Sequence, residues 1–206
     1  MFMLTESSMN CATHGQVAEF QQICDEVKNR SGYVSRYRGI AYRDSILGQA
    51  LDRLIITQVQ LYRSLIAPTQ IDSICDSAHD SLESVRRAGQ AAYLPFALMC
   101  YSWATCCSSD SYAKTLAQSL LDEAWDIAER GPMRLHMADI HLYRARLFFR
   151  DKEYPWREGR NLNGEFVTNR TAADDLAAAE KLINECGYHR RDEELADAKR
   201  AILGAA

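Results

Sequence analysis

The segment Ile127-Ala128-Glu129-Arg130-Gly131 ends an amphipathic stretch, and two other segments of the chain resemble it. They are residues 85–89 and 183–187, and each has a β-branched apolar residue four positions before a glycine. Glycine just past the last helical residue is typical of a helix C-terminus, because glycine adopts the left-handed conformation without strain. Gly89, Gly131 and Gly187 lie 42 and 56 residues apart. Recurring units of this size are typical of helical hairpins stacked in an α-solenoid.

Apolar residues spaced by three and four predict helices along most of the chain. The expected ranges are about 15–29, 42–66, 71–88, 94–105, 116–130, 135–149, 176–186 and 195–202. The 42–66 helix is apolar over much of its circumference, so we expect it to be central and packed from two sides. A turn is expected at residues 29–32. No segment between the helices has the period of a strand, so the sequence predicts an all-α fold.

Composition and charge exclude several classes of protein. The 206 residues are 47% hydrophobic and 25% charged, as in a globular domain or a short stack of helical pairs. A net charge of −4 gives no general attraction to nucleic acid or to an anionic membrane, so neither is an expected partner. The seven cysteines form no C-x-x-C pair, and the N-terminus lacks the pattern of a signal peptide. We therefore expect a cytoplasmic protein.

Residues 131–147 and 187–195 resemble the C-terminal repeats of bacterial tetratricopeptide-repeat proteins, where such repeats often follow a signalling or nucleotide-binding domain. Ala117, Leu121 and Ala124 are similar to the small–large–small trio on the second helix of a repeat. The resemblance implies antiparallel helical hairpins stacked as a TPR-like α-solenoid of about seven or eight helices. Residues 1–40 would be an N-terminal helical cap or extension, and 41–206 the repeat domain. The sequence departs from the repeat pattern at Ser102 and in an inserted loop at 151–170.

No constellation of residues predicts catalysis or a cofactor. His136, Asp139 and His141 invite a metal interpretation, but histidines five positions apart on a helix differ in direction by about 140° and cannot face one ion. We expect no metal, and we expect one of these histidines to bind a buried partner between helices. Cys106 and Cys107 lack a histidine nearby in sequence, and no nucleophile or phosphate-loop motif is present. We expect structural thiols, one of the two buried, in a protein that is not an enzyme.

Residues 130–170 hold nine basic and five acidic residues, in a chain that is acidic as a whole. In a tetratricopeptide groove the first helix of each pair lines the concave face, so Tyr101, Arg134, Tyr143 and Arg144 could project there. Arginine binds carboxylates with two parallel hydrogen bonds, which favours an acidic protein or peptide partner. The alternative is that these residues lie on solvated helix faces.

The loop at 151–170 is the other unusual feature, since connections of this length are uncommon and tend to be functional. Trp156 could be an anchor for a partner, or it could pack over the last helical pair. The preferred function is a scaffold or adaptor that binds a peptide or protein in a concave groove. The alternatives are an accessory subunit that acts by homo- or hetero-oligomerisation, such as a homodimer, and, less favoured, a small-molecule sensor.

Overall fold

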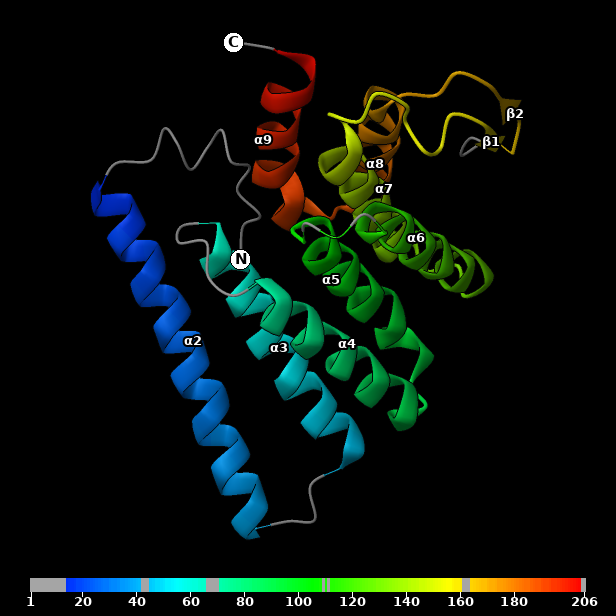
Figure 1. The fold of residues 1–206 in the computed structure, drawn as a ribbon. Helices are drawn as coiled ribbons and strands as arrows, with labels where there is room; N and C mark the ends of the chain where they lie inside the picture. Colours follow the sequence, from blue (N-terminus) through cyan, green and yellow to red (C-terminus); the bar gives the residue numbers. More distant parts are fainter. Residues whose placement is uncertain are drawn as a thin grey trace. The chain divides into compact units, whose positions relative to one another are not determined.

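The computed structural model describes residues 14–41, 45–65, 71–108, 110, 112–160 and 164–204. These residues form eight α-helices, which confirms the all-α fold class (Figure 1). The helices are α2 (His14–Ala41), α3 (Ile46–Ser64), α4 (Ile71–Ala88), α5 (Leu94–Cys106), α6 (Ala113–Arg130), α7 (Arg134–Phe148), α8 (Ala172–Cys186) and α9 (Asp192–Leu203). Short 3-10 helices, η1 (Ala91–Tyr93) and η2 (His189–Arg191), precede α5 and α9.

The chain divides into two compact units, one within residues 9–120 and the other containing residues 121–206. This division lies inside α6, whereas the sequence placed the domain boundary at residue 40. The helix α2, expected to belong to a separate cap, packs on α3 within the first unit. Residues 1–13 and 42–44 of the expected cap and boundary lie outside the described residues.

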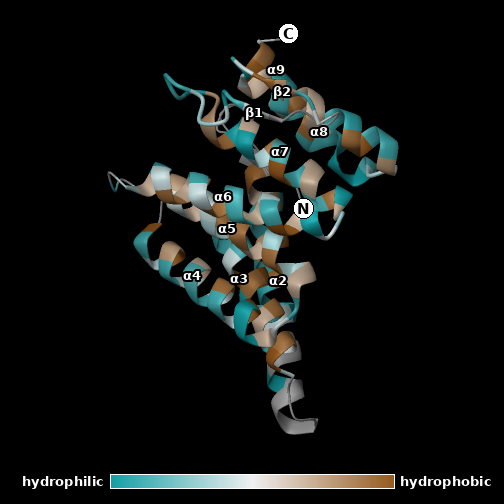
Figure 2. Ribbon diagram, turned by 90° about the vertical axis from the view of Figure 1, so that its right-hand side faces the viewer, coloured by the Kyte–Doolittle hydropathy of each residue, from teal (hydrophilic) through white to brown (hydrophobic). Residues whose placement is uncertain are grey.

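In the first unit, α3 packs against α2, α4 and α5, which confirms that it is central (Figure 1). Its N-terminus is capped by the Ser45 side chain, which accepts a hydrogen bond from the Gly48 backbone N–H at 3.0 Å. The next helix, α4, buries Ile74, Ala78 and Leu82 on one face. Figure 2 shows teal and brown residues alternating along its ribbon, as expected of a helix with one polar face.

Helix α5 is buried over most of its circumference, including residues 97–100 and 102–105. Pro95 lies in its first turn, where a proline is well tolerated. Ser102, where the repeat pattern has glycine or alanine, donates a buried hydrogen bond of 2.9 Å to the Ala117 carbonyl of α6. The hydroxyl therefore fits this helix contact without a loss of hydrogen bonding.

In the second unit, α7 packs against α8 and α9, and α8 packs against α9. The first unit has the same pattern of helix contacts, since α3 packs against both α4 and α5. Helices α3 and α7 thus each contact the next helix and the one after it, as helices of stacked hairpins do. The solenoid itself stays a prediction.

Two of the three similar helix ends are glycine caps. Gly89 and Gly187 have φ angles of 68° and 62°, which confirms their predicted role. Gly131 lies outside the left-handed region. The difference follows from Pro132, because a proline ring restricts the backbone of the residue before it.

Two sequence expectations differ from the structure. The turn expected at residues 29–32 is helical, because α2 continues through it to Ala41. An ion pair of 2.5 Å between Glu26 and Arg30 spans this part of α2 and supports the helix. The loop at 151–170 also contains a short antiparallel ladder, in which β1 (Gly159–Arg160) pairs with β2 (Phe166–Val167).

Candidate binding sites

The buried carboxylate of Asp175 is the centre of a polar network in the second unit. Asp175 lies in the first turn of α8 and is fully buried. Its Oδ1 accepts hydrogen bonds from His141 Nδ1 of α7 at 2.5 Å and from the Arg170 guanidinium at 2.6 Å. Its Oδ2 accepts a hydrogen bond from the Tyr154 hydroxyl. One side chain therefore joins two helices and the segment between them.

Burial and neighbouring charges fix the protonation of this network. Burial lowers the pKa of His141, and its hydrogen bond to Asp175 offsets this only in part. Burial alone would raise the pKa of Asp175, but His141, Arg170 and Arg144 hold that pKa below its usual range. Burial and the Asp175 charge raise the pKa of Tyr154, so its hydroxyl keeps its proton. At neutral pH the network therefore holds an ionised Asp175 and a neutral His141.

Arg144 lies beside this network between two tryptophan rings. Its guanidinium carbon is 5.1 Å from the ring centroid of Trp125 and 4.6 Å from that of Trp156. It pairs with Asp122 at 3.0 Å, and the Trp156 indole N–H donates to the same carboxylate oxygen at 2.6 Å. Trp156 also packs edge-on against Phe148, at 5.0 Å between ring centroids. The connection at residues 151–170, which we call the inserted segment, thus covers α7 with an aromatic side chain.

A pocket of about 340 Å³ is lined in part by His141. Its walls are His141, Val167, Thr168, Asn169, Arg170, Asp174 and Ala178. The Nε2 atom of His141 is buried and has no hydrogen-bond partner among the described residues. Residues 167–170 therefore form one wall of this pocket, and residues of α7 and α8 form the others.

A second network of charges joins α7 to the C-terminal end of the chain. Arg191 binds Asp139 at 2.8 Å and Glu194 at 2.6 Å, and the Tyr188 hydroxyl donates to Asp139 at 3.1 Å. Burial alone would lower the pKa of Arg191, but these two carboxylates raise it. Arg191 is paired with two carboxylates of the described residues, so this group stabilises the packing of α9.

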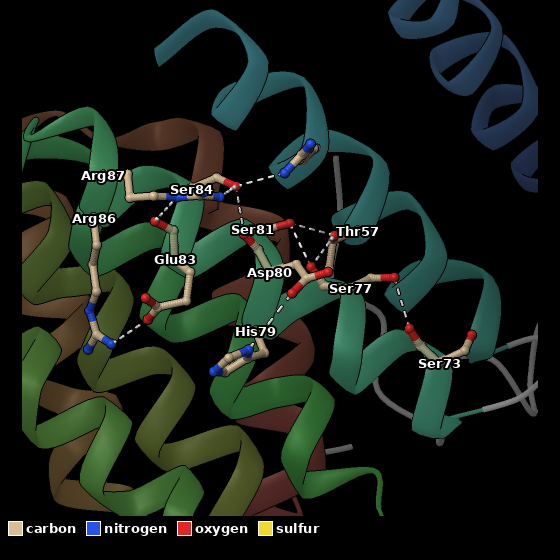
Figure 3. A network of polar contacts seen from close by, with 11 residues as sticks. Thr57, Ser73, Ser77, His79, Asp80, Ser81, Glu83, Ser84, Arg86 and Arg87 are labelled. Carbon is tan, nitrogen blue, oxygen red and sulfur yellow. Dashed lines mark hydrogen bonds and ion pairs between the residues drawn. The ribbon is translucent and has the colours of Figure 1, made fainter. Parts of the chain in front are cut away.

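In the first unit, two arginines from different helices converge on one hydroxyl. Ser84 Oγ of α4 accepts hydrogen bonds from Arg53 of α3 at 3.0 Å and from Arg87 of α4 at 3.3 Å. Figure 3 shows Arg87, Ser84 and the neighbouring polar side chains of α4. Arg86, next in sequence, instead pairs with Glu83 at 2.8 Å. Neither Arg53 nor Arg87 has an ion pair with a carboxylate of the described residues. We call Arg53 and Arg87 the arginine pair.

The five predicted partner-binding residues differ in their exposure. Tyr143, Arg144 and Trp156 are buried, and Arg144 and Trp156 contact each other within the second unit. Trp156 therefore packs over the helices, which was the alternative to its role as an anchor for a partner. Tyr101 is half-buried against the His79 ring in the first unit. Arg134 is exposed and forms an ion pair with Glu185.

The structure also shows where the residues considered for a metal site and for a reactive thiol lie. Asp139 binds Arg191, while His141 binds the buried Asp175, which confirms that one histidine satisfies a partner between helices. The part of the chain that the structure describes has no group of three histidine, cysteine or acidic side chains that could hold a metal ion. Cys106 and Cys107 are both half-buried, whereas burial of one was expected.

Asp175 and the arginine pair were missed by the sequence analysis. Asp175 lies four residues before Ala179 and eight before Ile183, on the apolar face of its helix. A carboxylate at such a position signals a buried polar contact. Arg53 and Ser84 are 31 residues apart, and no local pattern relates them.

Comparisons of this chain with protein-family models, with curated proteins and with solved structures give no significant match. The tetratricopeptide resemblance therefore stays a prediction. No helix among the described residues is long and apolar enough to cross a membrane.

Proposed function

We propose that this chain is a helical-repeat module of the cytoplasm that binds an acidic segment of a partner protein and catalyses no reaction. The arginine pair is the observation that carries this proposal. Two guanidinium groups at one hydroxyl repel each other, and a bound carboxylate would relieve that repulsion. Arginine also presents parallel donors that match the two oxygens of a carboxylate.

Stabilisation by a helix terminus explains the position of only one of the two arginines. Arg87 lies in the last turn of α4, where a cation interacts favourably with the helix dipole, and its Nε donates to the Glu83 carbonyl at 3.4 Å. Arg53 lies well inside α3 and gains nothing from a helix terminus. Its side chain crosses to α4 and ends beside a second cation, which favours recognition of an anion over a role in helix stability.

The cysteines support the proposed compartment. Cys24, Cys75 and Cys186 are free thiols among the described residues. Burial raises the pKa of the Cys24 and Cys75 thiols, so both stay protonated and unreactive at neutral pH. Free, unreactive thiols are typical of proteins in a reducing environment.

Binding of a fluorescein-labelled oligoglutamate peptide, followed by fluorescence anisotropy, tests the proposal. Oligoglutamine is the neutral counterpart. The double substitution Arg53→Gln and Arg87→Gln should weaken oligoglutamate binding at least tenfold, and added salt should weaken binding to the unsubstituted protein. Arg130→Gln is the matched control, because Arg130 also ends a helix and donates to a carbonyl four residues earlier, at 2.9 Å.

The control substitution should change the affinity less than twofold. Equal losses in the double variant and in Arg130→Gln would show that the peptide responds only to overall charge, and would refute the proposed site. Binding of oligoglutamine as tight as that of oligoglutamate would refute the acidic partner. Circular dichroism of each variant confirms that the helices remain folded.

A further inference from the structure

The start of α3, the end of α4 and the start of α5 lie at the same end of the first unit (Figure 1). Each of these helices contacts the other two. Two large apolar side chains are exposed there: Ile46, the first residue of α3, is 62% exposed, and Tyr93 of η1 is 39% exposed. Ala91 and Ala92 of η1 are exposed as well. We call Ile46 and residues 91–93 the apolar end of the first unit.

The packing of α3 against α4 explains why Ile46 is exposed. Thr57 of α3 is hydrogen-bonded to Ser81 of α4 at 3.0 Å, as Figure 3 shows. Four residues earlier in α3, Arg53 binds Ser84, which is three residues later in α4. The two helices are therefore antiparallel, and in this register α4 ends about one turn short of the start of α3. Ile46 lies beyond that end, so α4 does not cover it.

The arginine pair borders the apolar end. Arg53 follows Ile46 by seven residues, close to two helical turns, so both lie on the same face of α3 with their Cα atoms about 10 Å apart. Arg87 lies at the end of α4, four positions before Ala91. Both arginines are exposed, and hydrogen bonds to Ser84 hold their guanidinium groups in place. Two cations and an apolar surface are therefore adjacent on the first unit.

The position of the apolar end is what gives it significance. A single exposed apolar residue needs no partner, because such residues are common on protein surfaces. The apolar end, however, adjoins the arginine pair, where we expect a carboxylate of a partner. A segment that continues from this carboxylate toward η1 passes over the apolar end, where one of its apolar side chains would remove Ile46 from water.

We propose that the acidic segment bound by the arginine pair also carries a large apolar side chain, which packs on the apolar end. The separation of Ile46 from Arg53 sets the spacing of the two groups, since about 10 Å corresponds to about three residues of an extended chain. This inference rests on the proposed function. It makes the expected partner more specific, because the partner is then selected by an apolar group as well as by its charge.

Three fluorescein-labelled peptides of equal charge test this inference by fluorescence anisotropy with the full chain. The first has a leucine three residues from a pair of glutamates, and the second has serine in place of that leucine. The leucine peptide should bind more tightly by about fivefold, because it buries apolar surface. The third peptide has the leucine directly beside the glutamates and should bind like the serine peptide. The double substitution Arg53→Gln and Arg87→Gln should weaken binding of all three.

A matched pair of substitutions locates the apolar contact. Ile46→Ser should abolish the advantage of the leucine peptide and change the affinity for the serine peptide less than twofold. Ile55→Ser is the control, because Ile55 is also exposed on α3, at 38%, but lies nine residues from Ile46 and therefore on the opposite face. It should change both affinities less than twofold. Both residues are exposed, and circular dichroism checks that each variant stays folded.

The contrary results separate this inference from the proposed function. Equal binding of the leucine and serine peptides, or an unchanged leucine advantage in Ile46→Ser, would overturn the apolar contact but leave the arginine pair as an acidic site. Equal binding of the two leucine peptides would refute the spacing. Unchanged binding in the double arginine variant would overturn the proposed function and this inference together.

A second copy of this chain is the other possible occupant of the apolar end. Analytical ultracentrifugation of the protein without peptide distinguishes it from an acidic partner. We expect the unsubstituted protein and Ile46→Ser to sediment alike. A dimer that Ile46→Ser converts to a monomer would show that the apolar end joins two copies, and would overturn the inference.

Discussion

Replacement of Asp175 by asparagine should destabilise the second unit more than any other single change to its polar groups. The substitution keeps the size of the side chain but removes its charge. Asp175 is fully buried and accepts hydrogen bonds from His141, Arg170 and Tyr154. An asparagine oxygen can still accept one or two of these bonds. Its amide N–H₂ would face a donor, and Arg170 would lose its counter-ion.

The size of the effect follows from these contacts. Removal of one partner from a buried ion pair costs about 3–5 kcal/mol, because the other charge stays buried without compensation. The Arg170 side chain is 10% exposed, so water can solvate it in part. The expected loss is therefore near the lower end of that range, about 3 kcal/mol.

Urea denaturation measures this loss. Trp125 and Trp156 lie in the second unit and Trp103 in the first, so fluorescence in a Trp103→Phe background reports unfolding of the second unit. Asp174→Asn is the control, since Asp174 is exposed and only caps the helix through Thr171. It should cost about 1 kcal/mol. Equal losses for the two asparagine variants would refute the central role of the Asp175 network.

Four further substitutions or conditions test separate features. The stability of the second unit should fall as the pH drops below about 6.5. Burial lowers the pKa of His141, so below this pH the unfolded chain binds a proton that the folded chain resists. The urea midpoint of the His141→Phe variant should depend less on pH over this range. Gly187→Ala should cost about 1 kcal/mol in denaturation experiments because its φ angle is 62°. Gly32→Ala should instead add about 0.5–1 kcal/mol, since Gly32 is helical with open space around it. Ser102→Ala should lose about 1 kcal/mol through its hydrogen bond to the Ala117 carbonyl.

The sequence was sufficient to predict most of the helices. Apolar residues spaced by three and four located α3 to α9 within a few residues, because the buried face of each helix follows its period. Gly89 and Gly187 marked true helix ends. The prediction was wrong at residues 29–32, where Gly32 suggested a turn. A single glycine without a proline weakens a helix but does not end it.

The binding sites were harder to predict, because their residues depend on contacts distant in sequence. Arg144 looks like a surface cation in the sequence, but Asp122, Trp125 and Trp156 surround it in the structure. The pocket depends on His141 and Asp174, 33 positions apart, and on the path of the inserted segment. Helical periodicity carries no information about that path, so the fold was predictable and the pocket was not.

The Asp175 network restricts how the sequence of this protein can change during evolution. Tyr154 and Arg170 both belong to the inserted segment and its end, and both bind the same carboxylate. A relative in which this insertion was deleted would lose two donors at once and leave an uncompensated anion between α7 and α8. We therefore expect positions 141, 154, 170 and 175 to covary in descendants of one ancestor. Relatives with the shorter connection should carry apolar residues at 141 and 175.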